Sequence, residues 1–294
     1  MTSVAYGIAM PASRGVLGRP FPLLIDRLSA APTAAFATFR LTWAYAGACI
    51  RVRRSSDNVE QDIGFVGSAL DTAALLSFCG AGDGFVAKWY DQSGNARHLA
   101  QANAGLQPRI VSAGALITTI NGLPSVQFNG ANNYLAGIAL SNYVAASNYT
   151  TIALSRPSAG SASDSGYLPG PFNDTLGYYW HGFGATKFVA GHLNGGNRQI
   201  STPASYPNTF VSTHLFDGTA RKGWINGGAA TSIADTLGIQ NSSSNIQMAR
   251  ASTAYMNGAL ASALTFNSAI SLSDLNMIGA GFATKGGVTW TTAT

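Results

Sequence analysis

The sequence is short of charge. Only 10% of its 294 residues are Asp, Glu, Lys or Arg, and Glu60 is the single glutamate of the chain. Globular proteins usually carry about a quarter charged residues. The 17 basic and 12 acidic residues give a formal charge of +5 that is spread along the chain. Because no basic cluster is interleaved with aromatic residues, we expect no nucleic-acid partner.

Long apolar runs and cysteines are also scarce. No run reaches about 18 apolar residues, so we expect no membrane span and no membrane partner. Residues 1–31 lack the charged head and apolar core of a secretion signal, which favours synthesis in the cytoplasm. Cys49 and Cys79 are expected to be small buried residues, although a pairing between them stays open. We expect no metal site and no cofactor, while calcium at a sandwich rim is compatible with the sequence.

What the chain does contain is glycine, 34 residues of it, together with 46% hydrophobic residues. From residue 123 onward, short apolar runs alternate with Gly, Asn, Asp and Pro, which is typical of strands and tight turns. Asp217-Gly218 and Asn226-Gly227 are favoured hairpin turns. The predicted strands are 125–128, 149–155, 176–180, 209–216, 221–225, 246–249 and 260–266. The fold class predicted is all-β, a concanavalin A-like antiparallel β-sandwich (jelly roll) with few short helices.

The first part of the chain has a different pattern. Residues 1–32 are apolar, aperiodic and rich in proline, which predicts an extended arm that docks on the body or on a neighbouring subunit; residues 33–294 form the sandwich domain. We expect a short helix within 34–45, strands at 50–53 and 85–90, and a helix at 70–80 that Asp71 caps and Gly80 ends. Ser271 begins one more short helix.

Two stretches carry a resemblance. The strings RVRRSSDNVEQDIGF, LDTAALLSFCG and FVAKWYDQSGNARHLAQ, within residues 51–110, resemble the first half of the catalytic domain of fungal-type α-L-arabinofuranosidase B. The strings FNGANNYL, HLFDGTARKGWINGG and FNSAISLSDL resemble laminin-G and concanavalin A-like sandwiches. Both families imply a jelly-roll-like sandwich. The combination with an apolar arm and no secretion signal is similar in style to proteins of tailed bacteriophages.

Glycoside hydrolysis ordinarily needs two carboxyl groups placed across the scissile bond. The resemblance implies a glutamate nucleophile in the second half of the chain, and no residue there matches it. A pair of Asp91 with Asp164 or Asp174 is conceivable, although their spacing does not favour it. A Ser-His-Asp site lacks a nucleophile-elbow sequence. We therefore expect no catalytic residue and a degenerate glycoside hydrolase-like domain, more a binding protein than an enzyme.

Aromatic residues supply the candidate glycan-binding groups. The tract with Tyr178, Tyr179, Trp180 and His181 is flanked by glycines and could present rings to a sugar, or could equally be an ordinary core strand. Tyr90, Asp91 and Gln92 of the YDQSG string offer hydrogen-bonding groups beside a ring. The alternative, which we favour, is that Asp91 and Gln92 satisfy buried backbone groups and pair with Arg51, Arg53 or Arg54.

The densest charges are predicted to form a structural ion network of Arg51, Arg53, Arg54, Asp57, Glu60 and Asp62. The sequence as a whole favours a virion protein of phage type, a tail fibre, spike or capsid decoration subunit. Its partners would be a host surface polysaccharide, other virion proteins through the arm, and copies of itself in a homo-oligomer. The alternatives are an arabinofuranosidase-like glycoside hydrolase and a purely structural virion subunit.

Overall fold

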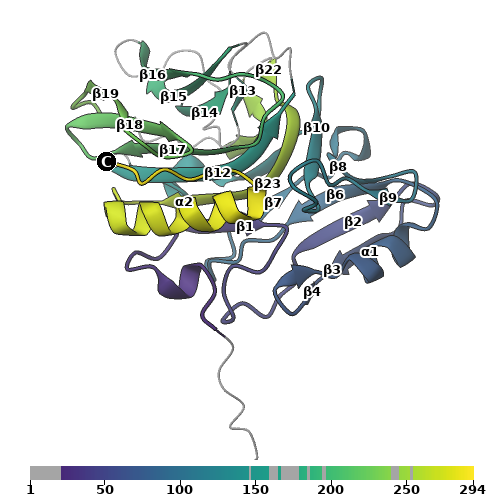
Figure 1. Cartoon of the computed structure of the whole chain (residues 1–294). Helices are drawn as coiled ribbons and strands as arrows, with labels where there is room; N and C mark the ends of the chain where they lie inside the picture. Colours follow the sequence, from purple (N-terminus) through teal and green to yellow (C-terminus); the bar gives the residue numbers. More distant parts are fainter. Residues whose placement is uncertain are drawn as a thin grey trace, which may run out of the picture.

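The computed structural model describes residues 21–145, 147–158, 165–166, 179–183, 186–193, 197–239, 245–251 and 254–294. These residues form an antiparallel β-sandwich with two α-helices, α1 (Thr72–Cys79) and α2 (Leu272–Gly286) (Figure 1). The prediction of an all-β sandwich is confirmed. Within the described residues, no helix has both the length and the apolar character needed to cross a bilayer.

One large sheet contains most strands, all paired antiparallel. Its hydrogen-bonded order is β19 (Thr231–Ala234), β18 (Ala220–Ile225), β17 (Phe210–Phe216), β12 (Tyr149–Pro157), β23 (Asn257–Phe266), β10 (Val126–Asn129), β8 (Arg109–Ser112), β6 (Gly84–Trp89), β7 (Leu99–Ala100), β11 (Leu135–Ala139) and β20 (Asn245–Met248). Four strands branch from this path: β1 (Ala34–Ala37) on β23, β2 (Ile50–Arg54) on β6, β3 (Glu60–Ile63) on β2, and β9 (Ala115–Leu116) on β8.

Smaller sheets and single turns complete the fold. A second sheet contains β13 (Ser165–Gly166), β14 (Tyr179–Phe183), β15 (Lys187–Leu193) and β16 (Asn197–Pro203). Two-stranded pairs are β4 (Phe65–Val66) with β5 (Ala69–Leu70), and β21 (Arg250–Ala251) with β22 (Ala254–Tyr255). Single 3-10 turns are η1 (Ile25–Arg27), η2 (Ala104–Leu106) and η3 (Leu140–Asn142).

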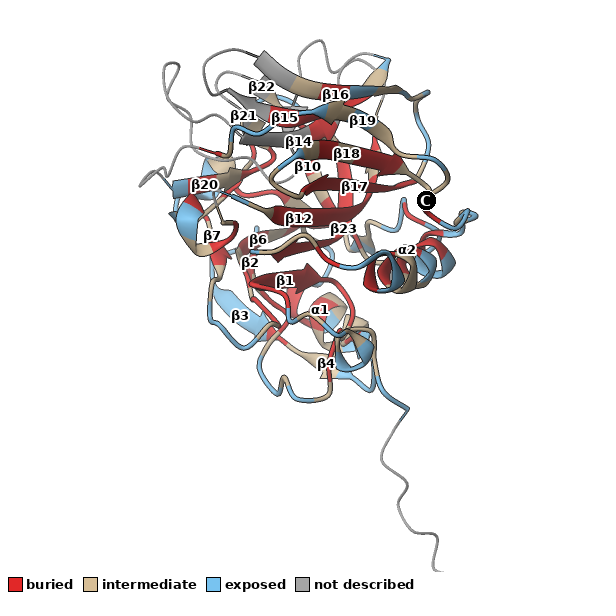
Figure 2. Cartoon of the chain, turned by 90° about the vertical axis from the view of Figure 1, so that its left-hand side faces the viewer, coloured by how far each residue is buried: buried red, intermediate tan, exposed pale blue. Residues whose placement is uncertain are grey.

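Nearly every side chain of the central strands β12, β17 and β23 is buried. Because side chains point alternately to the two sides of a strand, these strands are covered on both faces. One face packs against α2, where Ile152, Val211 and Leu264 meet apolar residues of the helix. The other face packs against β15 and β16 and continues into a second core around Trp89. Figure 2 shows these central strands as the buried middle layer, with α2 on one side and β15 and β16 on the other.

Helix α1 is capped by Asp71 and ended by Gly80 as the sequence predicts, and α2 begins at the predicted position. The Asp71 carboxylate accepts a hydrogen bond from the Ala74 N–H at the start of α1, and Gly80 follows its last turn. The Ser271 hydroxyl accepts from the Asp274 N–H at the start of α2. These side chains satisfy N–H groups that have no partner within the helix, a contribution of about 1 kcal/mol each. The helix α2 is longer than the short one expected.

The helix expected within residues 34–45 is wrong. Residues Ala34–Ala37 form β1, and all four side chains are buried. The strand pairs with β23, with Ala35 opposite Leu264. A short run of alanine and phenylalanine fits a helix or a strand equally well. Here the run forms a strand because it pairs with the edge of β23. Of the expected strand 176–180, residues 179 and 180 belong to β14, Tyr179–Phe183, and residues 176–178 lie outside the described residues.

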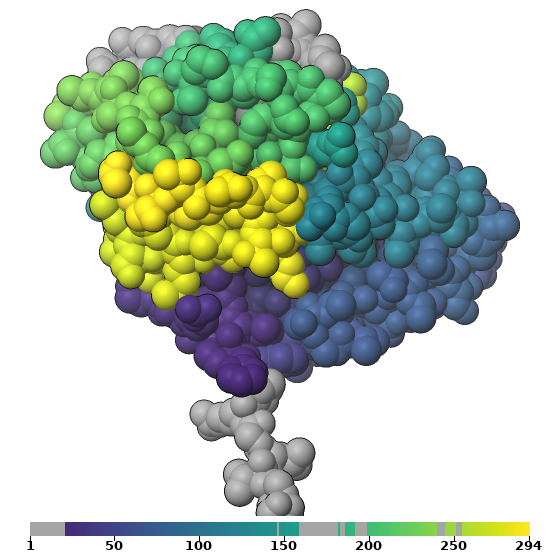
Figure 3. Space-filling view, in the orientation of Figure 1, coloured from purple at the N-terminus to yellow at the C-terminus, as the bar shows by residue number. Residues whose placement is uncertain are grey.

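Part of the predicted arm packs on the body. Leu24, Ile25 and Leu28 contact the core beneath α2, and the Asp274 carboxylate accepts hydrogen bonds from the Ser29 N–H and hydroxyl. Figure 3 shows this N-terminal segment beside α2. Residues 1–20 of the arm lie outside the described residues, so its role in assembly stays a prediction. Cys49 and Cys79 are free thiols, both buried, and burial raises the pKa of each.

Candidate functional site

The YDQSG element is a structural joint. The buried Asp91 carboxylate accepts hydrogen bonds from the backbone N–H groups of Ala35, Ser93 and Arg97. The Gln92 amide accepts from the Leu41 N–H and donates to the carbonyls of Ala37 and Phe39. Both side chains are 1% exposed. They therefore hold the chain around β1, and neither presents a polar atom to a ligand in this structure.

The arginine-rich stretch forms two separate ion pairs, not one network. Arg51 binds Asp62 through two hydrogen bonds of 2.7 and 2.8 Å, and Tyr90 donates to the same carboxylate. Partial burial and this bond to Asp62 raise the pKa of Tyr90 to about 12. The Tyr90 hydroxyl is thus engaged with a carboxylate, and its proposed role in glycan binding stays a prediction.

The second ion pair joins Arg54 to Asp57 at the surface, with hydrogen bonds of 2.8 and 2.6 Å. Two members of the predicted network stand apart. Arg53 donates to the side chains of Gln107 and Asn58, both uncharged. Glu60 is exposed on β3 and makes no ion pair within the described part of the chain. The expected arginine partner of Glu60 is absent because the side chain of its register neighbour Arg53 turns to Gln107.

For the aromatic glycan-binding candidates of residues 178–181, the structure describes only part of the backbone. Tyr178 lies outside the described residues. The backbone of Tyr179, Trp180 and His181 forms β14, which pairs with β15, with Trp180 opposite Gly191. Their side chains are outside the description, so the choice between a sugar platform and a core strand stays open.

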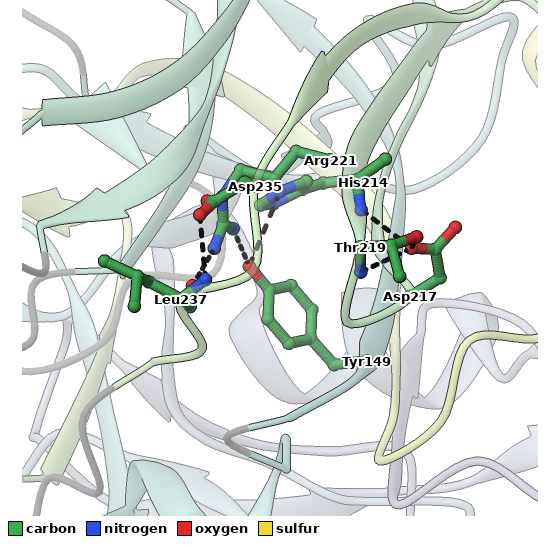
Figure 4. Close-up of polar contacts among 8 residues, drawn as sticks. Tyr149, His214, Asp217, Thr219, Arg221, Asp235 and Leu237 are labelled. Carbon is green, nitrogen blue, oxygen red and sulfur yellow. Dashed lines mark hydrogen bonds and ion pairs between the residues drawn. The ribbon is translucent and has the colours of Figure 1, made fainter.

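A buried polar cluster, which the sequence did not indicate, lies on β12, β17 and β18. Arg221 binds Asp235 at 2.5 Å, and neither side chain is exposed to solvent. The same guanidinium donates to the Tyr149 hydroxyl at 2.6 Å and to the Leu237 carbonyl at 3.1 Å. His214 Nε2 lies 3.5 Å from the Tyr149 oxygen. Figure 4 shows Arg221 bridging Asp235 and Tyr149.

This cluster is built for structure. Burial raises the pKa of Tyr149, so the phenol stays protonated and donates or accepts only as a neutral group. The Asp235 carboxylate also accepts from the Leu237 N–H, and the Arg221 guanidinium stacks 4.4 Å from the centre of the Phe216 ring. Because the ion pair is closed to solvent, substrate cannot reach its carboxylate in this structure.

The remaining described carboxylates are also committed. Asp26, Asp71, Asp83, Asp217 and Asp274 each accept hydrogen bonds from backbone or side-chain groups. Asp164 and Asp174 lie outside the described residues. Among the residues that the structure describes, no three His, Cys, Asp or Glu side chains gather as metal ligands. The described residues thus contain no carboxyl pair free for acid and base catalysis.

The pKa shifts of three aspartates also argue against a role in acid catalysis. Hydrogen bonds from Arg54 lower the pKa of Asp57 to about 2, and those from Arg51 lower the pKa of Asp62. Partial burial alone would raise the pKa of Asp217, but hydrogen bonds from Thr219 and Lys222 outweigh it and lower the pKa. A proton donor needs a raised pKa. These three aspartates are therefore unsuited to that role.

Comparison with known proteins places the chain near the arabinofuranosidases. The model of the α-L-arabinofuranosidase B catalytic domain matches residues 27–164. A Glu-to-Gln variant of a glycoside hydrolase family 54 α-L-arabinofuranosidase, soaked with 4-nitrophenyl α-L-arabinofuranoside, has a TM-score of 0.66 at 17% identity. An arabinofuranosidase complexed with arabinofuranosyl-α-1,2-xylobiose has a TM-score of 0.57 at 16% identity. Each comparison covers 87% of this chain and 63% of the solved one.

Another similar structure is the binding domain of the Paraclostridial mosquitocidal protein 1, with a TM-score of 0.51 at 13% identity. It covers 66% of this chain and 49% of the solved one. No curated protein matches the sequence. At these identities the structural likeness establishes the fold alone, and the chain spans less than two thirds of the arabinofuranosidases it matches.

These findings confirm the resemblance to an arabinofuranosidase B catalytic domain and correct the function expected from sequence. The reading as a phage virion protein that attaches to host glycans is wrong, because the matched family and the arabinofuranosidase structures are glycoside hydrolases. The virion reading rested on composition, the apolar arm and the apparent lack of a secretion signal. Those features describe how a chain is made and what surface it has, and they carry no information about a site.

Proposed function

We propose that this chain is a glycoside hydrolase that acts on α-L-arabinofuranosides. The observation that carries the proposal is the match of the arabinofuranosidase B catalytic model to residues 27–164. The YDQSG element at the centre of this span is intact as a folded joint, with Asp91 and Gln92 holding β1 in place. The likeness of fold over 87% of the chain supports the same proposal.

The missing glutamate does not by itself exclude hydrolysis. The reaction needs one carboxyl group that donates a proton and a second, ionised one that attacks the sugar or activates water, and aspartate can fill either role. Nine of the ten described acidic residues are engaged in hydrogen bonds or ion pairs, and the tenth, Glu60, is exposed on β3 without a partner acid. We therefore propose Asp164 and Asp174 as the two acids of the reaction. Asp164 is also the last residue of the matched span.

The direct test uses 4-nitrophenyl α-L-arabinofuranoside and the purified chain. We expect release of 4-nitrophenol, and a loss of about 100-fold or more in kcat for Asp164→Asn and for Asp174→Asn, as for removal of a general acid or base. Asp57→Asn is the matched control, because Asp57 pairs with Arg54 at the surface. No release by the unmodified chain, or equal activity in all three variants, would contradict the proposal.

A second candidate is retention of arabinofuranosides without turnover. The observation that favours it is the commitment of the described carboxylates, with the single glutamate exposed on β3. Saturable binding of arabinotriose in a calorimeter, together with no 4-nitrophenol release, would identify this function in place of hydrolysis.

A further inference from the structure

The outer face of the large sheet carries a row of side chains across four neighbouring strands. In register, Arg53 of β2 lies opposite Phe85 of β6, Phe85 opposite Arg109 of β8, and Arg109 opposite Gln127 of β10. Figure 1 shows β2, β6, β8 and β10 running side by side. The adjacent residues Val86, Ile110 and Val126 point the other way into the core. The row therefore belongs to a surface that the sandwich core does not use.

A cavity of about 650 Å³ stands on this row. Phe85, Arg109 and Gln127 form its floor, and two segments form its walls. One wall is η2 with Gln107, and the other is the turn Asn129–Asn133 between β10 and β11. Small-molecule sites in proteins usually occupy roughly 300 to 1,000 Å³. The cavity is thus of the size that holds a short oligosaccharide.

The walls are fixed by hydrogen bonds of their own. The Asn129 side-chain oxygen accepts from the backbone N–H groups of Ala131, Asn132 and Asn133, which shapes the turn. Arg53 donates to Gln107, whose amide in turn donates to the Gln101 carbonyl. The site is therefore preorganised, and a ligand would lose little free energy in ordering it.

Two amide oxygens in the lining have no donor among the described residues. Asn133 is 8% exposed, and its amide nitrogen makes only a long contact of 3.3 Å to Asn132, while its oxygen accepts no hydrogen bond. The Gln127 amide nitrogen donates to the Phe128 carbonyl, and its oxygen is likewise unused. Neither oxygen is closed off from solvent, so both are open to the cavity. A ligand that supplies hydroxyl or N–H donors can therefore reach them.

The charge of the lining selects an uncharged ligand. Among the described residues that line the cavity, Arg109 is the one charged side chain, and it already pairs with Asp83 at 3.2 Å. Amide side chains both donate and accept, as do sugar hydroxyls. Phe85 and Ile117 add an apolar surface for the carbon face of a sugar ring. No carboxylate lines the cavity within the described residues, so it offers no acid or base for hydrolysis.

We propose that this cavity is an accessory, non-catalytic binding site for a short uncharged oligosaccharide. Binding here would hold a polysaccharide chain on the protein without cleaving it. The choice of arabinotriose as the probe rests on the proposed function, while the site itself rests on the geometry of the cavity.

The test measures binding of arabinotriose, xylotriose and trigalacturonate by NMR titration of the full chain. We expect saturable binding of at least one neutral trisaccharide, weakened about fivefold or more by Asn133→Ala and by Gln127→Ala, as for loss of a hydrogen bond. The control is Asn208→Ala, since Asn208 is exposed and bonds only to Ser205 within the described residues. Thermal unfolding of each variant reports whether the fold is retained.

Each outcome bears on one proposal at a time. Binding of neutral trisaccharide that is unchanged in folded Asn133→Ala and Gln127→Ala, binding of trigalacturonate alone, or no saturable binding would overturn the accessory site. If the unmodified chain releases no 4-nitrophenol but binds a neutral trisaccharide that both variants bind more weakly, the hydrolase proposal is overturned and the accessory site is supported. If the unmodified chain releases 4-nitrophenol but shows no trisaccharide binding that depends on Asn133 and Gln127, the accessory site is overturned and the hydrolase proposal is supported.

Discussion

The surface ion pairs of β2 and β3 and the buried ion pair of β18 use the same two kinds of side chain in opposite environments. Arg54 and Asp57 remain 33% and 43% exposed, whereas Arg221 and Asp235 are not exposed at all. In water the attraction between charges is weak, so a surface pair contributes little to stability. In the core, removal of one partner leaves an uncompensated charge. The clustered charges of residues 51–62, which stand out in the sequence, therefore contribute less to stability than the buried pair of Arg221 and Asp235.

The sharpest test of this difference is Arg221→Ala. We expect the free energy of unfolding to fall by about 3 to 5 kcal/mol, because Asp235 and Tyr149 would lose their buried partner. Urea denaturation measures the change. Lys222→Ala on the same strand removes a partly exposed pair with Asp217 and should cost no more than about 1 kcal/mol. Equal losses in the two variants would contradict the comparison.

An intermediate effect is expected for Asp91→Ala, which removes a buried carboxylate that makes no ion pair within the described residues. Three backbone N–H groups would lose their acceptor, at a cost of about 1 to 3 kcal/mol. The same denaturation assay applies, and hydrogen exchange of the Ala35 amide should quicken. Asn208→Ala serves as the control, because Asn208 is exposed and bonds only to Ser205 within the described residues. A stable Asp91→Ala variant would mean that the YDQSG element is not the joint described above.

The smallest effect concerns Asp57, whose pKa the hydrogen bonds from Arg54 hold at about 2. A carboxyl group with a depressed pKa contributes stability above its unfolded pKa, near 3.9, and loses it as the pH falls through the folded value. The contribution should therefore vanish between about pH 4 and pH 2. Carboxyl NMR titration should find a midpoint near 2, and Arg54→Gln should return it toward 3.8. A midpoint near 3.8 in the unmodified chain would show that the pair does not persist in solution.

Local signals in the sequence predicted local structure well. Asp71 and Gly80 marked the ends of α1, Ser271 marked the start of α2, and Asp217-Gly218 marked the turn between β17 and β18. Each is a preference of one or two residues for one backbone geometry. Such preferences act before any tertiary contact forms, so they can be found without knowing the fold.

Long-range features could not be found in this way. Arg221 and Asp235 are 14 positions apart and no quoted motif contains both, so only the fold brings them together. The cavity floor has the same origin, because Phe85, Arg109 and Gln127 become neighbours through strand register. The alternation of Gln127 with the buried Val126 and Phe128 was the one available signal, and it marks a face without saying what lies beside it.

The pairing of β1 with β23 has a consequence for how the chain folds. Ala34 lies opposite Thr265, and β23 also pairs with β10 and β12. Three strands from earlier in the sequence therefore depend for their pairing on a strand near the end of the chain. Contacts between distant parts of a chain form slowly. Until β23 arrives, β10 and β12 present unpaired edges that can join other chains. We therefore expect a chain that ends before residues 257–266 to aggregate.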